Sequence, residues 1–155
     1  MTTRTVMVHG RRKWLKVYLS GGIAGMTFEE ANVWRSQVTE QLRSFGIQAL
    51  NPLRGRMFLG TAEGEDFDPN ELVQRDLRDI RNCDLVLVHM ELPSLGTSME
   101  IWQAHYIEKK PVILVTTNPH ISGHPWVRVA STKMFADMDK AIEYIVTRWA
   151  DVEEM

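Results

Sequence analysis

Two carboxylates and a tyrosine in this sequence have the chemistry of a group-transfer site. Glu100 follows the stretch PSLGTSM at the start of a predicted helix, and the dipole there would keep it ionised as a nucleophile or base. Asp76 borders the apolar face of another predicted helix, where desolvation would raise its pKa enough for a general acid. Tyr18 lies near the end of the first predicted strand, from which its hydroxyl could reach the same cleft.

Two short segments have the composition of binding loops. Ser94 and Gly96 precede Glu100, and hydroxyl and amide groups at a helix start can hold a phosphate or a sugar hydroxyl. The loop GGIAG follows the first strand, and its glycines let the backbone approach an anion. The candidate binding residues of this loop are Gly22, Ile23, Ala24 and Gly25.

Each of these features also has an ordinary structural explanation. The glycine loop can be a plain tight turn, because it does not match the G-x-G-x-x-G pattern. Glu100 can be the capping-box partner of Thr97 or Ser98. Asp76 can be a solvated member of a charged helix, and Tyr18 can be a core residue. The chemistry is therefore predicted from the convergence of these features at one edge of a sheet.

The elements that must position these residues alternate between short apolar strands and helices. Strands are predicted at 16–20, 47–50, 85–88, 112–115 and 134–136. One predicted helix is opened by Thr27 and terminated by Gly46. Further helices are predicted at 69–82, 97–108 and 137–150, and 117–125 is expected to be a loop. This alternation predicts an α/β domain with an open, doubly wound, five-stranded parallel sheet. Ligands bind beyond the carboxyl ends of such strands, which is where the candidate segments fall.

Length and composition limit the classes of function. With 155 residues, 44% of them hydrophobic, the chain is expected to form one domain at 15–155 after a loose leader at 1–14. A net charge of −2 does not favour nucleic acid or a membrane as partner. Cys83 is the only cysteine, which fits a cytoplasmic protein without a disulfide. His120 and His124 lie in a predicted loop without further ligands, so no metal site is expected.

The order of four segments resembles the nucleoside 2-deoxyribosyltransferase family. The segments are YLSGGIAG, QRDLRDIRNCDLVLV, PSLGTSMEIWQA and KKPVILV, within residues 16–116. The branch that hydrolyses 2'-deoxynucleoside 5'-monophosphates is the most similar, and the family fold is Rossmann-like or flavodoxin-like. The resemblance implies that Glu100 is the nucleophile at the anomeric carbon, that Asp76 protonates the leaving base and that Tyr18 orients Glu100. It also implies that Ser94 marks a monophosphate hydrolase, where the transferases have aspartate.

The chain departs from that branch in its first loop. The hydrolases carry a serine and an arginine for phosphate there, and this sequence has Gly22 and Ala24. Arg54 or Arg56 of the long loop at 53–68 could supply the missing charge. Asn51 and the same long loop are expected to shape the base pocket.

The resemblance further implies the partners of the protein. It implies a small-molecule nucleoside or nucleotide substrate and no cofactor. It also implies a homodimer or higher homo-oligomer in which residues of a neighbouring subunit, from the region 118–124, complete each site.

The predicted function is an N-glycosidase that cleaves the base–sugar bond of a 2'-deoxynucleoside 5'-monophosphate through a covalent glycosyl-Glu100 intermediate. A transferase that exchanges bases through the same intermediate is the nearest alternative. A non-catalytic nucleotide-binding module or an oligomeric scaffold would use the same fold without chemistry, because a fold does not determine a function.

Overall fold

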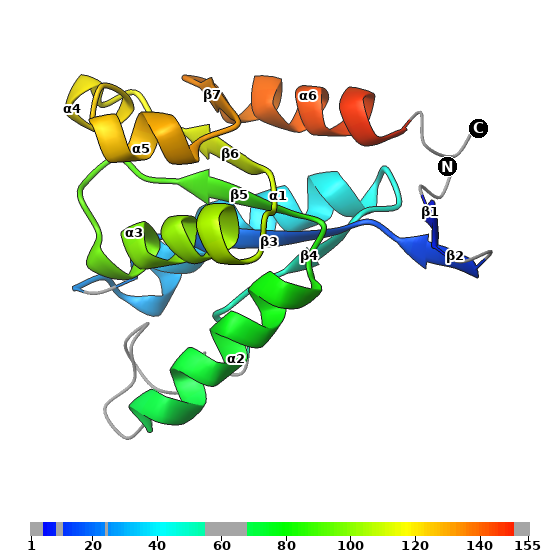
Figure 1. The fold of residues 1–155 in the computed structure, drawn as a ribbon, viewed down its shortest axis with the longest axis horizontal. Coiled ribbons are helices and arrows are strands. Elements are labelled where there is room, and N and C mark those ends of the chain that lie inside the picture. The colour runs from blue at the N-terminus through cyan, green and yellow to red at the C-terminus, as the bar shows by residue number, and fades with distance from the viewer. Residues whose placement is uncertain (1–4, 9–10, 24, 55–67, 151–155) are drawn as a thin grey trace.

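A computed structural model describes residues 5–8, 11–23, 25–54 and 68–150. Its main sheet has five parallel strands in the spatial order β4-β3-β5-β6-β7 (Figure 1). The strands are β3 (Lys16–Gly21), β4 (Gln48–Leu50), β5 (Leu85–His89), β6 (Val112–Val115) and β7 (Lys133–Phe135). The predicted doubly wound parallel sheet is thereby confirmed.

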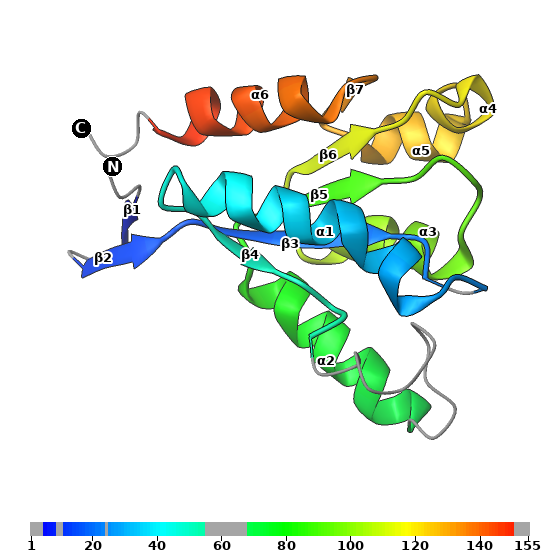
Figure 2. The same ribbon diagram turned by 180° about the vertical axis from the view of Figure 1, so that it is seen from behind.

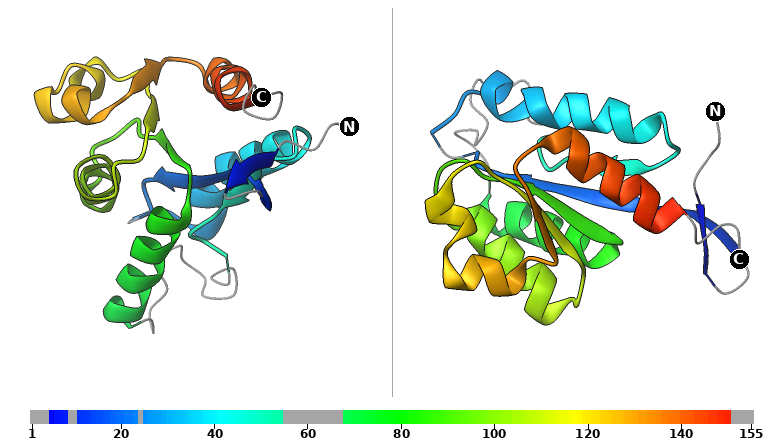
Figure 3. Two further views of the ribbon diagram at one scale, coloured as in Figure 1. Left: turned by 45° about the vertical axis from the view of Figure 1, so that its right-hand side comes forward. Right: turned by 90° about the horizontal axis from the view of Figure 1, so that it is seen from above.

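Four main helices cover the two faces of this sheet. They are α1 (Phe28–Arg43), α2 (Pro69–Asn82), α3 (Leu95–Trp102) and α6 (Met138–Ala150). Helices α1 and α6 lie on one face, and α2 and α3 lie on the other (Figure 3). The central strands β3, β5 and β6 therefore bury both of their faces, which is why they read as continuous apolar runs, while the edge strands β4 and β7 are partly exposed.

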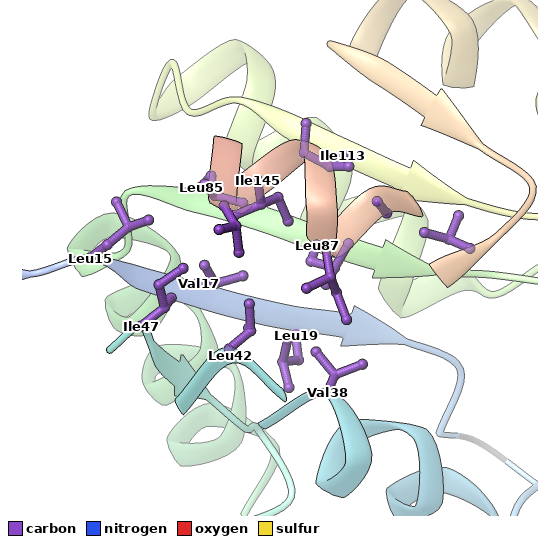
Figure 4. Close-up of a cluster of buried hydrophobic side chains, with 14 residues drawn as sticks. Leu15, Val17, Leu19, Val38, Leu42, Ile47, Leu85, Leu87, Ile113 and Ile145 are labelled. Carbon is purple, nitrogen blue, oxygen red and sulfur yellow. The ribbon is translucent and has the colours of Figure 1, made fainter. Parts of the chain in front are cut away.

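Alternation along β3 divides the core into two layers. Val17 and Leu19 point toward α1 and α6, whereas Tyr18 points to the side of α2 and α3. Figure 4 shows the first of these clusters, in which residues of β3, β5 and β6 contact the apolar sides of α1 and α6. The second cluster lies on the opposite face and joins Tyr18 to apolar side chains of β5, β6, α2 and α3.

Two predicted helix starts and one predicted helix termination are confirmed. The hydroxyl of Thr27 caps α1 by accepting from the backbone N–H of Glu30 at 3.1 Å. Asp68 caps α2, with Pro69 at its first turn. Helix α1 ends at Arg43, and Gly46, the residue predicted to terminate it, follows with φ 74°. The N–H of Gly46 donates to the carbonyl of Arg43 at 2.9 Å, so this glycine closes the end of the helix in a left-handed turn.

Helix α3 begins earlier than predicted. Ser94 is its cap and accepts from the backbone N–H of Thr97 at 3.3 Å, so the cap is neither Thr97 nor Ser98. The helix ends at Trp102 and continues as the π-helical segment η2 (Gln103–Ile107). Glu100 is therefore the sixth residue of the helix and does not lie in its first turn.

The predicted loop at 117–125 contains two short helices. These are α4 (Pro119–Ser122) and α5 (Pro125–Ala130), each with a proline in its first turn. Asn118 caps α4 through its side-chain oxygen, and the ring of His124 caps α5. At both places a polar residue followed by proline begins a helix. The prediction of a loop at 117–125 overlooked this pattern.

The segment predicted as a loose leader contains an antiparallel pair of strands. These are β1 (Thr5–Val8) and β2 (Arg11–Trp14), and they form a sheet of their own that extends away from the main one (Figure 2). Among the described residues, no helix has the length and apolar character needed to cross a membrane.

The packing of the central strand predicts a large effect of truncation there. Leu87 of β5 is fully buried in the cluster of Figure 4, so Leu87→Ala should lower the free energy of unfolding by about 2–5 kcal/mol. Val33 of α1 is 54% exposed, and Val33→Ala should change it by less than about 0.5 kcal/mol. Urea denaturation of both variants measures this. Equal losses would contradict the assigned core.

Candidate active site

The candidate site lies where the winding of the sheet reverses. The chain passes from β3 to β4 at one edge, and then returns past β3 to β5 on its other side. Ligands of such sheets bind outside the carboxyl ends of the strands at this reversal, here the ends of β3 and β5. β3 carries Tyr18, and the connection after β5 leads into α3, which carries Glu100.

Two hydroxyl groups of β3 hold the carboxylate of Glu100. The phenol of Tyr18 donates a hydrogen bond to Oε2, and the hydroxyl of Ser20 donates to Oε1 at 3.2 Å. Tyr18 and Ser20 are two residues apart on one strand, so their side chains share a face of the sheet. Both are fully buried. Each oxygen of the carboxylate thus has its own donor.

The protonation of Glu100 differs from the sequence-based expectation. Burial raises its pKa from 4.5 to about 7, and the negative charge of Asp76 adds to that rise. The hydrogen bonds from Tyr18 and Ser20 and the positive charge of Arg35 act in the opposite direction without cancelling it. The predicted helix-start effect on Glu100 is wrong, because the residue lies in the second turn of α3 and burial dominates.

Asp76 approaches this pair from α2. One of its carboxylate oxygens is buried, and its charge raises the pKa of both Glu100 and Tyr18. The pKa of Tyr18 lies well above its usual 10, because of burial first and then the charges of Glu100 and Asp76. The phenol therefore remains a neutral hydrogen-bond donor at neutral pH. The structure brings the three predicted chemical residues together.

Two residues of this cluster were missed at the sequence level, Ser20 and Arg35. Arg35 of α1 is fully buried; its guanidinium donates to the carbonyls of Gly21 at 2.9 Å and Ala31 at 2.5 Å. The Cζ atom of this guanidinium also lies 4.7 Å from the centroid of the Trp34 ring. The sequence contained a signal for each of them. Arg35 is a cation in the apolar stripe of a helix, and Ser20 is a hydroxyl residue two positions after Tyr18 on the same strand.

The glycine loop after β3 is only partly described. Gly22 and Ile23 are partly buried, and Ile23 packs near Leu53. Gly25 is exposed with φ 77°, a conformation that favours glycine, while Ala24 lies outside the described residues. The backbone here thus takes a sharp turn beside the carboxyl end of β3.

The predicted binding residues after β4 and β5 make local contacts. Ser94 uses its hydroxyl as the cap of α3, and Gly96 is exposed in the first turn, with open space where a Cβ would lie. Asn51 donates to the side-chain oxygen of Asn32 at 2.8 Å and accepts from the N–H of Leu53 at 2.9 Å, which holds the turn after β4. These contacts hold the turns that follow β4 and β5.

The arginines proposed for phosphate are differently placed. The guanidinium of Arg54 pairs with Asp79 at 2.6 Å and donates to the carbonyl of Asn51 at 2.9 Å. Its charge is thereby compensated by Asp79. Arg56 lies outside the described residues.

A metal centre and a surface hollow are two other kinds of site, separate from the residues around Glu100. Within the described ranges, no three His, Cys, Asp or Glu side chains are grouped so that they could hold a metal ion. A surface hollow of about 420 Å³ lies along α2, lined by Glu71, Gln74, Arg75, Arg78 and Arg81. None of these lining residues is among the groups that contact Glu100.

Comparison with known proteins identifies the family. The sequence profile described as "Nucleoside 2-deoxyribosyltransferase like" matches residues 14–119, which include β3, the glycine loop, α2 and α3. The chain belongs to this family. The resemblance found in the sequence is therefore confirmed, and membership supports an enzyme of the nucleoside deoxyribosyl-transfer or N-glycosidase type.

Individual relatives agree with this assignment. A Thermofilum pendens protein, for which a 2'-deoxynucleoside 5'-phosphate N-hydrolase activity has been suggested, is 28% identical over 137 residues, covering 83% of this chain and 91% of its own. The fold matches a 2-deoxyribosyltransferase of Bacillus psychrosaccharolyticus with TM-score 0.62 at 22% identity, over 83% of this chain and 91% of that one. It also matches a CMP N-glycosidase of Clostridium botulinum with TM-score 0.54 at 19% identity, over 85% and 98%.

The raised pKa of Glu100 predicts that the protein loses stability as the pH rises. The unfolded chain loses this proton near pH 4.5 and the folded one near 7, so stability from this group is present below 4.5 and is lost as the pH rises to about 7. Glu100→Gln removes the titration. The free energy of unfolding of Glu100→Gln, relative to that of wild type, should therefore rise by up to about 3 kcal/mol between pH 5 and pH 8. Urea denaturation at the two pH values measures this.

The matched control for that experiment is Glu143→Gln, which changes an exposed glutamate of α6. Its difference from wild type should be the same at both pH values. If Glu100→Gln behaves in the same way as this control, the carboxylate is not buried as described.

Proposed function

We propose that the protein is an N-glycosidase that cleaves the base–sugar bond of a 2'-deoxynucleoside 5'-monophosphate in two steps. The observation that carries this proposal is the Glu100 carboxylate, held by Tyr18 and Ser20 at the carboxyl end of β3, with Asp76 close enough to influence its charge. A carboxylate oriented by two donors beside a second acid is the arrangement that a double displacement at an anomeric carbon requires.

In the first step, an ionised oxygen of Glu100 attacks the anomeric carbon of the sugar. The bond between that carbon and the base nitrogen breaks, and the base leaves with the bonding electron pair. Asp76, as the general acid, gives its proton to the departing base. Tyr18 keeps its hydrogen bond to the carboxylate, because its raised pKa leaves the phenol protonated. The product of this step is a glycosyl ester on Glu100.

In the second step, water attacks the same anomeric carbon. The bond from that carbon to Glu100 breaks, and Glu100 leaves as a carboxylate. The Asp76 carboxylate formed in the first step takes the proton of the attacking water. The enzyme returns to its starting state, and the products are the free base and deoxyribose 5-phosphate.

The preference for a 5'-phosphate rests on the start of α3. Ser94 is uncharged and caps the helix, so the first amides of α3 and a partial positive charge lie beside it. An acidic residue in that place would repel a phosphate, while serine does not. The suggested activity of the Thermofilum pendens relative supports the same substrate class. Gly22 to Gly25 are proposed to contribute backbone donors, and Asn51 to border the base.

A transferase that passes the sugar to a second base is the alternative. It is favoured by Gly22, which brings no side-chain donor to the first loop for a phosphate. Both activities share the glycosyl ester on Glu100. They differ in whether water or another base completes the second step.

We also propose that the protein self-associates through α3 and α5. Leu95, Met99 and Trp102 follow one another along α3 and are 87%, 73% and 41% exposed. Trp126 and Val129 of α5 are similarly exposed, and the ring of Trp126 lies 5.5 Å from that of Trp102. Contiguous apolar surface of this kind marks association sites. A second copy would cover it beside the helix that carries Glu100.

The enzymatic proposal predicts base release that depends on Glu100. Incubation with the four deoxynucleoside 5'-monophosphates, followed by chromatography, should show free base from at least one of them. Glu100→Ala should reduce the rate by roughly a thousandfold or more, because the nucleophile is lost. Glu143→Ala, which removes an exposed glutamate, should retain wild-type turnover.

Three outcomes separate the alternatives. Unchanged turnover in Glu100→Ala contradicts the mechanism. A new nucleoside or nucleotide after addition of a second base identifies a transferase, whereas a hydrolase gives only free base and sugar. Tight nucleotide binding without any base release indicates a non-catalytic module.

The self-association proposal predicts a species larger than one chain in size-exclusion chromatography with light scattering. Trp126→Glu should reduce its mass, because it places a charge in the apolar surface of α5. Val33→Glu alters another exposed apolar residue, on α1, which covers the other face of the sheet, and should not change the mass. A monomeric wild-type protein would contradict the proposal.

A further inference from the structure

Ser20 is a buried residue whose hydroxyl contacts Glu100. The residue is fully buried in β3, between the apolar Leu19 and the glycine that ends the strand. Its hydroxyl donates to Oε1 of Glu100 at 3.2 Å, and in the part of the chain that the structure describes it makes no other hydrogen bond. Buried hydroxyls are costly unless they are paired, so the contact with Glu100 is the reason a polar side chain can occupy this position.

The geometry of the two donors decides how the carboxylate is oriented. Rotation about the last side-chain bond of a glutamate has only broad, shallow preferences. A single donor, such as the phenol of Tyr18, holds one oxygen and still allows the plane of the carboxylate to turn. A second donor on the other oxygen fixes that plane. Tyr18 binds Oε2 and Ser20 binds Oε1, so together they determine the direction in which the carboxylate faces.

We infer that Ser20 is a positioning residue, which fixes the orientation of the Glu100 carboxylate. As a donor to a charged oxygen, its hydroxyl also favours the ionised form of Glu100. The effect on rate rests on the proposed function, whereas the effect on the protonation of Glu100 does not. Ser20 is not proposed to touch the reacting atoms. It acts through Glu100. Only the ionised carboxylate is free of a proton on both oxygens, so it can accept a hydrogen bond from a separate donor on each of them.

The other charged and titratable groups that face Glu100 define the background for a test. These are Tyr18 of β3, Asp76 of α2 and Arg35 of α1. Tyr18 and Arg35 favour the ionised carboxylate, while Asp76 opposes it. Replacement of Ser20 leaves all three in place. A change in the titration of Glu100 would therefore report the loss of the Ser20 hydrogen bond.

The first experiment titrates Glu100 by NMR with carbon-13 label in the glutamate carboxyl groups. The resonance is assigned by its absence in Glu100→Gln. Ser20→Ala removes the donor and should raise the midpoint from about 7 by about one pH unit. Ser20→Cys keeps a side chain of similar size with a weaker donor and should raise it by less. Ser131→Ala loses a hydroxyl that bonds to the carbonyl of Val127, and should leave it unchanged.

The second experiment measures the pH dependence of base release. In Ser20→Ala, kcat should fall about tenfold with little change in KM, and the acidic limb of kcat/KM should move to higher pH by the shift seen in NMR. A purely structural role would lower the melting temperature without moving that limb.

The outcomes separate this inference from the proposed function. If wild type releases no base but Ser20→Ala shifts the Glu100 midpoint, the proposed function fails and the hydrogen bond to the carboxylate stands. If wild type is active and neither the midpoint nor the acidic limb moves in folded Ser20→Ala and Ser20→Cys, Ser20 is not a positioning residue.

Discussion

The contact between the Glu100 carboxylate and the hydroxyl groups of β3 is the constraint on which the rest of the site depends. It joins a residue of α3 to a strand 80 and 82 positions earlier in the chain, across the point where the winding of the sheet reverses. The parallel pairing of β3 with β5 brings the two elements side by side, and the first connection then places the glycine loop next to them. Removing the contact would leave the fold possible but the carboxylate without a defined direction.

The electrostatics of the site follow from the same contact. Withdrawing the partly buried carboxylate of Glu100 from water is costly, and the structure offsets only part of that cost with two hydrogen bonds and the charge of Arg35. The remainder appears as the pKa of about 7 for Glu100, so both protonation states are accessible near neutral pH. Asp76 adds a second acid whose charge opposes that of its neighbour. Two interacting carboxyl groups in unlike surroundings are the means by which one group can act as nucleophile and the other as acid.

Much of this arrangement could be predicted from the sequence, because it depends on local patterns. Short apolar runs separated by helical periodicity indicated the sheet, and the positions of Tyr18, Asp76 and Glu100 at one edge followed from it. The start of α3 could not be chosen, since Ser94, Thr97 and Ser98 are all suitable caps, and only tertiary packing selects among them. The pKa of Glu100 and the buried position of Arg35 depend on contacts between distant segments, which no local pattern reports.

The central claim is that Glu100 forms a bond to the sugar, and the most direct measurement is mass spectrometry of the trapped enzyme. A single-turnover reaction with enzyme in excess over a 2'-deoxynucleoside 5'-monophosphate is quenched in acid, and the peptide released by trypsin between Arg81 and Lys109 is sequenced. We expect a deoxyribose 5-phosphate adduct on Glu100 at early times, which is absent in Glu100→Gln. Base release with Glu100 unmodified at every time, or an adduct on a different side chain, would contradict it.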